Sequence, residues 1–144
     1  MSGVAVVWYL LKTNSNVIAV VPAARVSSGN PVPLNAALPS IAVFQISSIP
    51  NNFIHTNAAN KMHSDRVQVS VKCKWPQTSD TATGFPGAKS LLQLVLAACP
   101  NQRGTVNGIV VDSIVPDIEQ IAEADTIDGI QEGSRDFLVK WIGA

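Results

Sequence analysis

The sequence predicts an α+β domain in which a single layer of about four, mainly antiparallel strands is covered on one face by two helices. Residues 66–75 alternate apolar and polar side chains, as in a strand with one buried face. Residues 88–99 repeat apolar side chains every three to four positions, as in a helix that packs on such a face. The expected element order is helix, strand, strand, helix, strand, strand. Strands in runs with helices gathered on one face are typical of α+β layers rather than parallel α/β sheets.

The start of the chain contributes the first helix. Residues 4–12 are expected to be helical because Ser2 is a good N-cap, although three β-branched valines in the segment lower its helix propensity. This helix is expected to end near Asn14. A second short apolar piece, residues 17–21, is stopped by Pro22.

A loop and a long strand are expected next. Residues 23–39 contain three prolines, a glycine and two asparagines, which predicts a loop with a brief strand at residues 25–28. Residues 41–49 are rich in β-branched and aromatic side chains and predict a strand that Pro50 ends. Residues 51–64 show almost no periodicity and predict a long loop.

The alternating strand begins at residue 65 and has one dry and one wet face. The side chains expected to point inward are Val67, Val69, Val71, Cys73 and Trp75. Those expected to point outward are Arg66, Gln68, Ser70, Lys72 and Lys74. The helix over residues 88–99 presents an apolar stripe to the dry face, and Pro100 ends it.

Two further strands complete the predicted sheet. Residues 106–115 predict the third strand, and the polar segment 116–130 predicts a second long loop. The last strand covers residues 134–142, with Leu138 and Ile142 on the face opposite its aromatic residues. Both faces are partly apolar, so we expect one face to pack on the core and the other on a neighbouring subunit.

Length and composition describe one domain that associates. A chain of 144 residues has the usual size of a domain and can bury a core without a metal or disulfide. Ten Lys and Arg balance ten Asp and Glu, and 14% of the residues are charged against 47% hydrophobic. Near-zero net charge favours an oligomer subunit, although a well-buried monomer would share this composition. There is no basic excess that would favour nucleic acid as the main partner.

Targeting and cysteine content point to an intracellular setting. The apolar N-terminal stretch lacks a preceding positive charge and a cleavage site, and it is too short to span a bilayer. A soluble, unsecreted protein without a membrane partner is therefore expected. Cys73 and Cys99 stand on the dry faces of the strand and helix, which favours two buried thiols over a disulfide.

Candidate catalytic and ligand-binding motifs have simpler structural explanations. Residues 84–90 open a helix as a phosphate-binding loop does, but Ala88 stands where that motif needs glycine before Lys89. His55 and His63 have no cysteine or acidic pair at ligand spacing. No residue stands in a nucleophile motif. The sequence therefore predicts no catalytic, cofactor-binding or metal-binding residue and no enzymatic activity.

Two groups of charged residues leave alternatives open. The acidic side chains from Asp112 to Asp128 do not match the calcium-loop spacing, so a solvated loop is favoured over a cation site. Arg66, Lys72 and Lys74 form a basic row that could face phosphate groups of nucleic acid. The alternative, which we favour, is a row that keeps a sheet face wet.

The order of several sequence features carries a family resemblance. Leu38-Pro39 precedes the first long strand, Arg66 opens the alternating strand, and residues 137–141 form an alternating aromatic strand at the end. With an N-terminal helix and a helix that begins near Ala88, nearly the whole chain resembles the tail completion and tail terminator proteins of long-tailed bacteriophages. These features are packing patterns rather than catalytic signatures.

The resemblance implies a structural virion protein that is assembled in the host cytoplasm and located at the head-tail junction. Family members form a hexameric ring at the head-proximal end of the tail, end polymerisation of the tail tube and provide the docking surface for the head connector. The implied partners are other copies of the chain, the tail tube protein, the connector and passing DNA without sequence specificity. The alternatives are a head-tail connector or neck (stopper) protein and, outside the virion, a small-ligand-binding α+β domain.

A ring requires heterologous contacts, in which one patch of a subunit meets a different patch of the next. We expect these contacts at apolar side chains on polar loops and on the second face of the last strand, because such side chains gain burial only from a partner. The expected interface residues are Phe53, Ile54, His55, Ile118, Ile121, Ile127, Ile130, Leu138 and Ile142.

Overall fold

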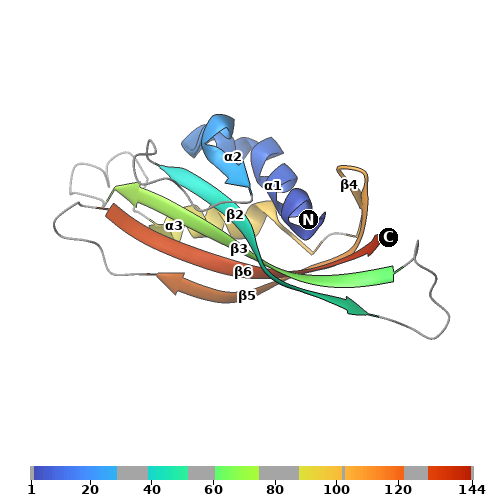
Figure 1. The fold of residues 1–144 in the computed structure, drawn as a ribbon. Helices are drawn as coiled ribbons and strands as arrows, with labels where there is room; N and C mark the ends of the chain where they lie inside the picture. The colour runs from blue at the N-terminus through green and yellow to red at the C-terminus, as the bar shows by residue number, and fades with distance from the viewer. Residues whose placement is uncertain are drawn as a thin grey trace.

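The computed structural model describes residues 2–28, 39–51, 61–74, 88–101, 103–121 and 130–143. The helices in this part of the chain are α1 (Ser2–Thr13), α2 (Ser15–Val20) and α3 (Ala88–Ala98), and a 3₁₀ turn lies at Ala23–Arg25. The strands are β1 (Val26–Ser28), β2 (Ser40–Asn51), β3 (Lys61–Lys74), β4 (Gly104–Val106), β5 (Ile109–Ile121) and β6 (Ile130–Gly143). These strands form one curled sheet with the helices gathered on one side of it (Figure 1).

The strand order across the sheet is β1-β2-β3-β6-β5-β4. The pair β1–β2 is parallel, and the other neighbouring strands are antiparallel. The two central strands, β3 and β6, pair along their whole length, from Lys61 opposite Gly143 to Lys74 opposite Ile130. The C-terminal strand therefore lies in the middle of the sheet.

The core lies between the helices and the face of the sheet that they cover. β3 buries Val67, Val69, Val71 and Cys73 there, which confirms the expected dry face, and Trp75 lies outside the described residues. The helices add Val7 and Leu11 of α1 and Leu91, Leu92 and Val95 of α3 to the same cluster. We call the covered side of the sheet the inner face and the other side the outer face.

The predicted layer of about four strands under two helices is wrong. Within the residues that the structure describes, the sheet has six strands, includes a parallel pair and is curled, and three short helices cover its inner face. The brief strand expected at residues 25–28 is β1, which the count of four omits. Strands β1 and β4 span three residues each, and such segments are too short to show a period in the sequence.

The additional helix α2 follows α1 almost without interruption. α1 ends at Thr13, close to the end expected near Asn14. The Asn14 side chain accepts hydrogen bonds from the backbone N–H groups of Asn16 and Val17, at 3.0 and 3.1 Å. This N-cap satisfies donors that a helix start leaves unpaired, so the short apolar piece forms a second helix.

Strand bulges contribute to the curl. Ile46 in β2 and Asp112 in β5 are extra residues without a counterpart on the neighbouring strand, and Asp117 and Ile118 of β5 stand opposite the single residue Asp136. A bulge bends its strand and increases the local twist. An extra residue also shifts the alternation of side chains, so a simple period of two cannot locate it.

The strands reach further into the expected loops than predicted. β2 extends to Asn51 and β3 begins at Lys61, so residues 51–64 are not all loop. β5 continues to Ile121 and β6 begins at Ile130, which shortens the loop expected at residues 116–130 in the same way.

The predicted strand at residues 106–115 is in fact a hairpin. Asn107 and Gly108 have positive φ angles of 50° and 77° and join β4 to β5. Asn-Gly is a strong signal for a two-residue hairpin turn, because both residues tolerate positive φ. The turn was therefore readable in the sequence and was missed.

Both cysteines are buried thiols, as expected. Burial raises the pKa of the Cys73 thiol to about 11 and that of the Cys99 thiol to about 12, from an ordinary value of 9.0. Removal from water disfavours the charged thiolate, so both groups stay protonated at neutral pH.

These thiols predict a loss of stability in alkali. Between about pH 9 and pH 11 the unfolded chain releases thiol protons that the folded chain retains, so the free energy of unfolding falls by up to about 1.4 kcal/mol per pH unit for each thiol. Urea unfolding at several pH values measures this slope. A Cys99→Ala variant serves as the control, because the other alkaline groups are unchanged. An identical slope in the variant would contradict the assignment.

Candidate interaction surface

The outer face of the sheet is covered by none of the described helices. In antiparallel strands, directly paired residues lie on the same face. Phe137 and Val139 of β6 are buried on the inner face, so Leu138 between them points to the outer face. The residues that pair with Leu138 lie on the outer face as well, and the other rows follow by alternation. This assignment divides the outer face into two halves of different character.

One half is apolar. Met62 of β3, Ile142 of β6 and Val110 of β5 form one row across three strands, and Leu138 pairs with Val115. Val110 and Val115 are 47% and 44% exposed, and Ile49 of β2, which precedes the first row on the same face, is 62% exposed. We call this half the apolar end; its residues are Ile49, Met62, Val110, Val115, Leu138 and Ile142.

The other half is polar and begins one row beyond Leu138. We call it the polar end; its residues on the two central strands are Gln68, Ser70 and Lys72 of β3 and Glu132, Ser134 and Asp136 of β6. In the same rows β2 contributes Phe44, Ala42 and Ser40, and Ala42 and Ser40 are 0% and 2% exposed, so the β2 part of this end is buried. Lys72 forms an ion pair with Glu132 at 3.2 Å. The face therefore changes from apolar to polar along the strands.

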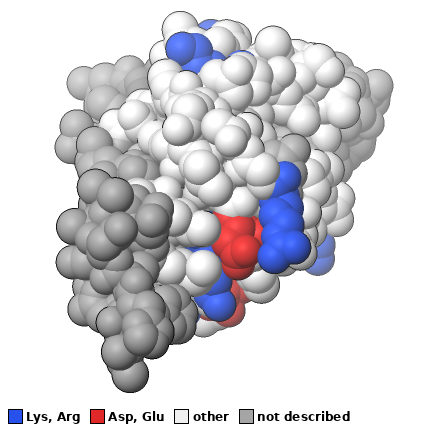
Figure 2. Space-filling view, turned by 90° about the vertical axis from the view of Figure 1, so that its right-hand side faces the viewer, with Lys and Arg blue, Asp and Glu red and all other residues white. Residues whose placement is uncertain are grey.

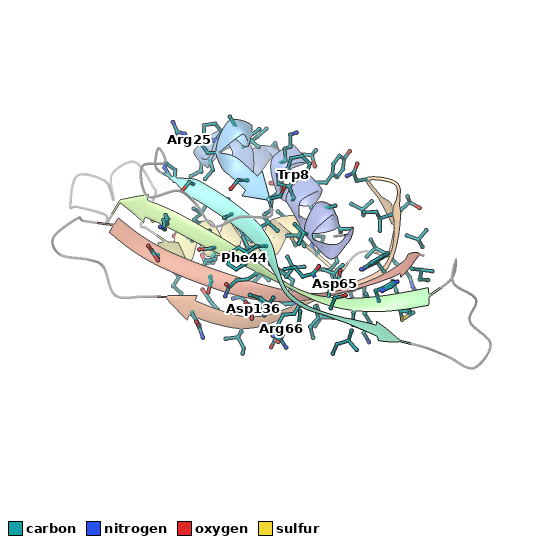
Figure 3. The ribbon with its side chains drawn as sticks, in the orientation of Figure 1. Trp8, Arg25, Phe44, Asp65, Arg66 and Asp136 are labelled. Carbon is teal, nitrogen blue, oxygen red and sulfur yellow. The ribbon has the colours of Figure 1, made fainter. Side chains whose placement is uncertain are left out.

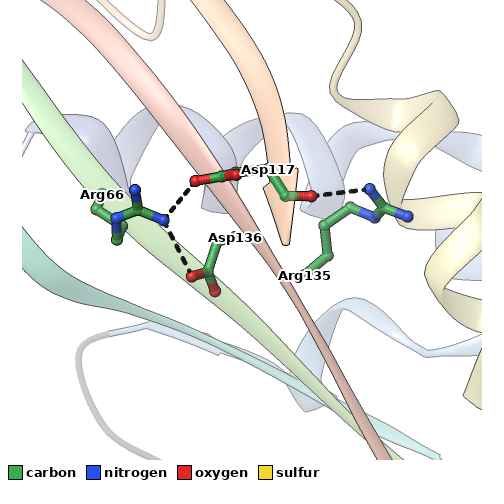
Figure 4. A network of polar contacts seen from close by, with 4 residues as sticks. All are labelled: Arg66, Asp117, Arg135 and Asp136. Carbon is green, nitrogen blue, oxygen red and sulfur yellow. Dashed lines mark hydrogen bonds and ion pairs between the residues drawn. The ribbon is translucent and has the colours of Figure 1, made fainter. Parts of the chain in front are cut away.

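An ion-pair network lies at the boundary between the two ends. The guanidinium of Arg66 binds the carboxylates of Asp117 in β5 and Asp136 in β6, the latter at 3.4 Å (Figure 4). The hydrogen bond to Asp117 raises the pKa of Arg66, and the Asp136 carboxylate adds to this effect. The arginine thus joins three neighbouring strands on the outer face.

The same network holds the bulge of β5 from both sides. Arg135, which pairs with Val69 and so belongs to the inner face, donates a hydrogen bond to the backbone carbonyl of Asp117 at 3.3 Å. Its guanidinium also pairs with Glu119 at 2.7 Å. Figure 4 shows the two arginines reaching Asp117 from opposite directions. The bulge is therefore fixed, and it holds Ile118 at 54% exposure.

Two of the three residues of the basic row suggested as phosphate-facing already have acidic partners within the sheet. Arg66 and Lys72 are paired with carboxylates of the same sheet, and the side chain of Lys74 lies outside the described part of the chain. These ion pairs favour the wet-face interpretation over phosphate binding. The described surface at the end of the molecule that lies to the right in Figure 1 is also mostly uncharged, with a few acidic and basic side chains side by side (Figure 2).

We expect Lys72→Gln to leave the affinity for DNA unchanged, because Lys72 already has an acidic partner. Fluorescence anisotropy with a labelled duplex at low and physiological salt checks this. Lys140→Gln is the matched control, since Lys140 is an exposed lysine of the same face. A loss of affinity and a smaller salt slope for Lys72→Gln would restore the phosphate-facing interpretation.

A buried polar cluster lies on the inner face beneath the N-terminus of α1. Asp65 is 1% exposed and accepts hydrogen bonds from the backbone N–H of Gly3 at 3.1 Å, the indole N–H of Trp141 at 2.8 Å and the hydroxyl of Ser48. The ring of His63 stacks on Trp141 with a centroid distance of 4.2 Å. Figure 3 places Asp65 on the side of α1, away from Arg66 and Asp136.

Asp65 lies in β3 and its hydrogen-bond partners come from α1, β2 and β6, so this one side chain connects four elements. A carboxylate at a helix N-terminus is favoured by the helix dipole as well as by the hydrogen bond. Sequence reasoning missed this residue, although it has the same alternation parity as Val67 and so was due to point inward. An acidic residue at a core position is the signal that could have found it.

The predicted interface residues fall into three groups. Leu138 and Ile142 lie half-buried on the outer face, and Ile118 is exposed at the β5 bulge. Ile121 and Ile130 end β5 and begin β6, but their side chains are outside the description. The remaining residues lie outside the described ranges: Phe53, Ile54, His55 and Ile127.

Other parts of the apolar end were not anticipated. Ile49, Met62, Val110 and Val115 stand in segments expected to be strand or loop and were not assigned to a surface. The bulges of β2 and β5 change the alternation there, so only the strand pairing assigns these residues to the outer face.

The described side chains of the acidic segment pair with arginines rather than with one another. Across the described ranges, no three His, Cys, Asp or Glu side chains come together as a metal site requires. Several members of the acidic segment instead pair with arginines: Asp117 with Arg66, Glu119 with Arg135, and Asp112 with Arg103 at 3.3 Å. Among the described helices, none combines the length and apolar character needed to cross a bilayer.

Comparison with known proteins identifies the fold. No protein-family model matches the chain, and no curated protein matches it. A solved structure does match: the chain resembles a chain from the virion of a native gene transfer agent particle, with a TM-score of 0.62 and 13% sequence identity. The match covers 97% of this chain and 94% of that chain. At this identity the likeness shows a shared fold.

Proposed function

We propose that this protein is a structural component of a phage-like virion without enzymatic activity. The observation that carries the proposal is the fold match over almost the full length of both chains to a chain of a virion particle. The exposed apolar side chains Ile49, Val110 and Val115 support it, because exposed apolar patches mark surfaces that bind other proteins.

Within the virion, the proposed role is that of a tail terminator. Copies of the chain form a ring, a hexamer, on the head-proximal end of the tail tube, end its polymerisation and provide the docking surface for the head connector. The order of sequence features supports this role, as does the low charge of the chain, which lets neutral copies approach one another. The proposed partners are the tail tube protein and the connector, at the head-tail junction.

Electron microscopy of the protein mixed with tail tubes purified without it tests this role. We expect a ring at one end of each tube and no further growth of capped tubes when tube protein is added. Capped tubes should then join filled heads. The alternative role of neck protein predicts instead that the protein stays on filled heads made without tails and leaves tube growth unchanged. That result would overturn the terminator proposal.

A further inference from the structure

The free edges of the sheet are the first candidate for contact between copies, because an exposed edge can add a strand from another chain. β1 pairs only with residues 41–43 of β2, and β4 pairs only with residues 109–111 of β5. The rest of each long strand has a single neighbour among the described strands.

Both edges are interrupted. The free part of β2 contains the extra residue Ile46 and Pro50, and that of β5 contains Pro116 between its two bulges. A proline lacks the N–H that a strand ladder needs, and a bulge breaks the ladder and twists the edge away. An added strand could therefore not pair continuously along either edge.

The apolar end of the outer face is better suited to contact. It spans β2, β3, β6 and β5 and keeps its central residues, Met62, Leu138 and Ile142, half-buried. Side chains in this position bury their remaining apolar surface when a partner packs on them. The fixed bulge holds Ile118 in a defined position on the same strand as Val115.

Charge indicates which partner fits. On the outer face Arg66 binds Asp117 and Asp136, and Lys72 binds Glu132, so most of the described charges of this face are neutralised within the sheet. A neutral surface does not attract a polyanion or a strongly charged protein. The chain itself has a formal net charge of +0 and so matches it.

The chain also exposes two large apolar side chains on the opposite side. The exposed large apolar residues of the described helices are Tyr9 of α1 and Ile18 of α2, at 38% and 39%. The helices cover the inner face, so these residues and the apolar end lie on opposite sides of the sheet. Two different patches on one chain are what a heterologous contact requires.

We propose that the apolar end of the outer face binds the α1–α2 side of the next copy of this chain, by packing of side chains rather than by strand addition. This inference rests on the proposed ring and specifies its subunit contact. Val115 and Val110 contact the neighbouring copy, and Tyr9 and Ile18 lie on the opposing surface.

The test compares two lysine substitutions on the same face. Val115→Lys places a charge in the contact, whereas Gln120→Lys places it on an exposed residue of the same strand at the polar end. Ring assembly is measured by mass photometry in solution and by electron microscopy on tail tubes, with melting temperatures as the folding check. We expect Val115→Lys to weaken assembly at least about tenfold and Gln120→Lys to assemble as the wild type does. Val110→Lys replaces Val115→Lys if that variant fails to fold.

Cysteine cross-linking identifies the two surfaces directly. A chain with Tyr9→Cys and Val115→Cys should form disulfide-linked multimers under mild oxidation. A chain with Ile46→Cys and Gln120→Cys, which marks the two free edges, should not.

Each outcome decides between the proposals. If the wild type assembles but Val115→Lys assembles equally well, or if both lysine variants are equally impaired, the proposed contact is overturned and the ring stands. If only the variant with cysteines at the two free edges forms multimers, the contact is strand addition rather than side-chain packing, and the proposed contact is likewise overturned. If the wild type forms no ring in solution or on tubes, the proposed function itself fails.

Discussion

Val71→Asp is expected to unfold the protein. Val71 is fully buried on the inner face between Ile41 of β2 and Gly133 of β6, under the helices. An aspartate there must bury a charge without a partner or take up a proton, and either costs more than about 4 kcal/mol. Because a domain of this size has a free energy of unfolding of about 5 to 15 kcal/mol, most of its stability is lost. Circular dichroism and thermal melting measure the effect.

Ser70→Asp is the matched control for this change. Ser70 is the adjacent residue of β3, and its side chain lies on the polar end of the outer face. Ser70→Asp introduces the same aspartate into the same strand, so the two variants have the same net charge and the same unfavourable β-strand propensity at the substituted position. Ser70 is half-buried beside the buried Ala42, so we expect the control to lose some stability but to melt well above Val71→Asp, because its charge stays in contact with water. Equal melting of both variants would show that the assignment of the inner face is wrong.

Asp65→Ala is expected to have the second largest effect, a loss of about 3 kcal/mol in the free energy of unfolding. The change leaves the backbone N–H of Gly3 and the indole N–H of Trp141 without their acceptor and also removes the bond from Ser48. Buried donors without partners carry their full desolvation cost. Urea unfolding measures the difference.

Two further variants separate hydrogen bonding from packing at this cluster. Asp65→Asn keeps the shape and one acceptor oxygen, so its loss should lie between those of the wild type and Asp65→Ala. Gly3→Ala should also destabilise, because an added Cβ would lie 2.7 Å from the Cβ of Asp65. Wild-type stability in Asp65→Ala would mean that the three hydrogen bonds contribute nothing net.

The central part of the fold followed from local sequence patterns. The alternation in β3 assigned its buried side chains, and the apolar spacing in α3 assigned the helix that covers them. Both patterns are reliable because these elements are long and have one fully buried face. The second apolar face of β6, with Leu138 and Ile142, was also anticipated.

Other features depended on contacts between segments distant in the chain. β1 forms by pairing with β2, and β4 by pairing with β5 across the Asn107–Gly108 turn. The ion pairs of Arg66 reach across 51 and 70 residues, to Asp117 and Asp136. No local pattern indicates which carboxylate will meet which arginine.

The sequence by itself determined the inner face of β3, the helix that packs on it, the buried thiols and the apolar second face of β6. These follow from periodicity and burial, which are properties of residues near one another in the chain. Only the tertiary structure decided the six-stranded order, the curl and the apolar end of the outer face. Strand pairing sets the face on which each side chain lies, and one extra residue in a bulge changes that face. The interaction surface therefore became visible only once the pairing of distant strands was known.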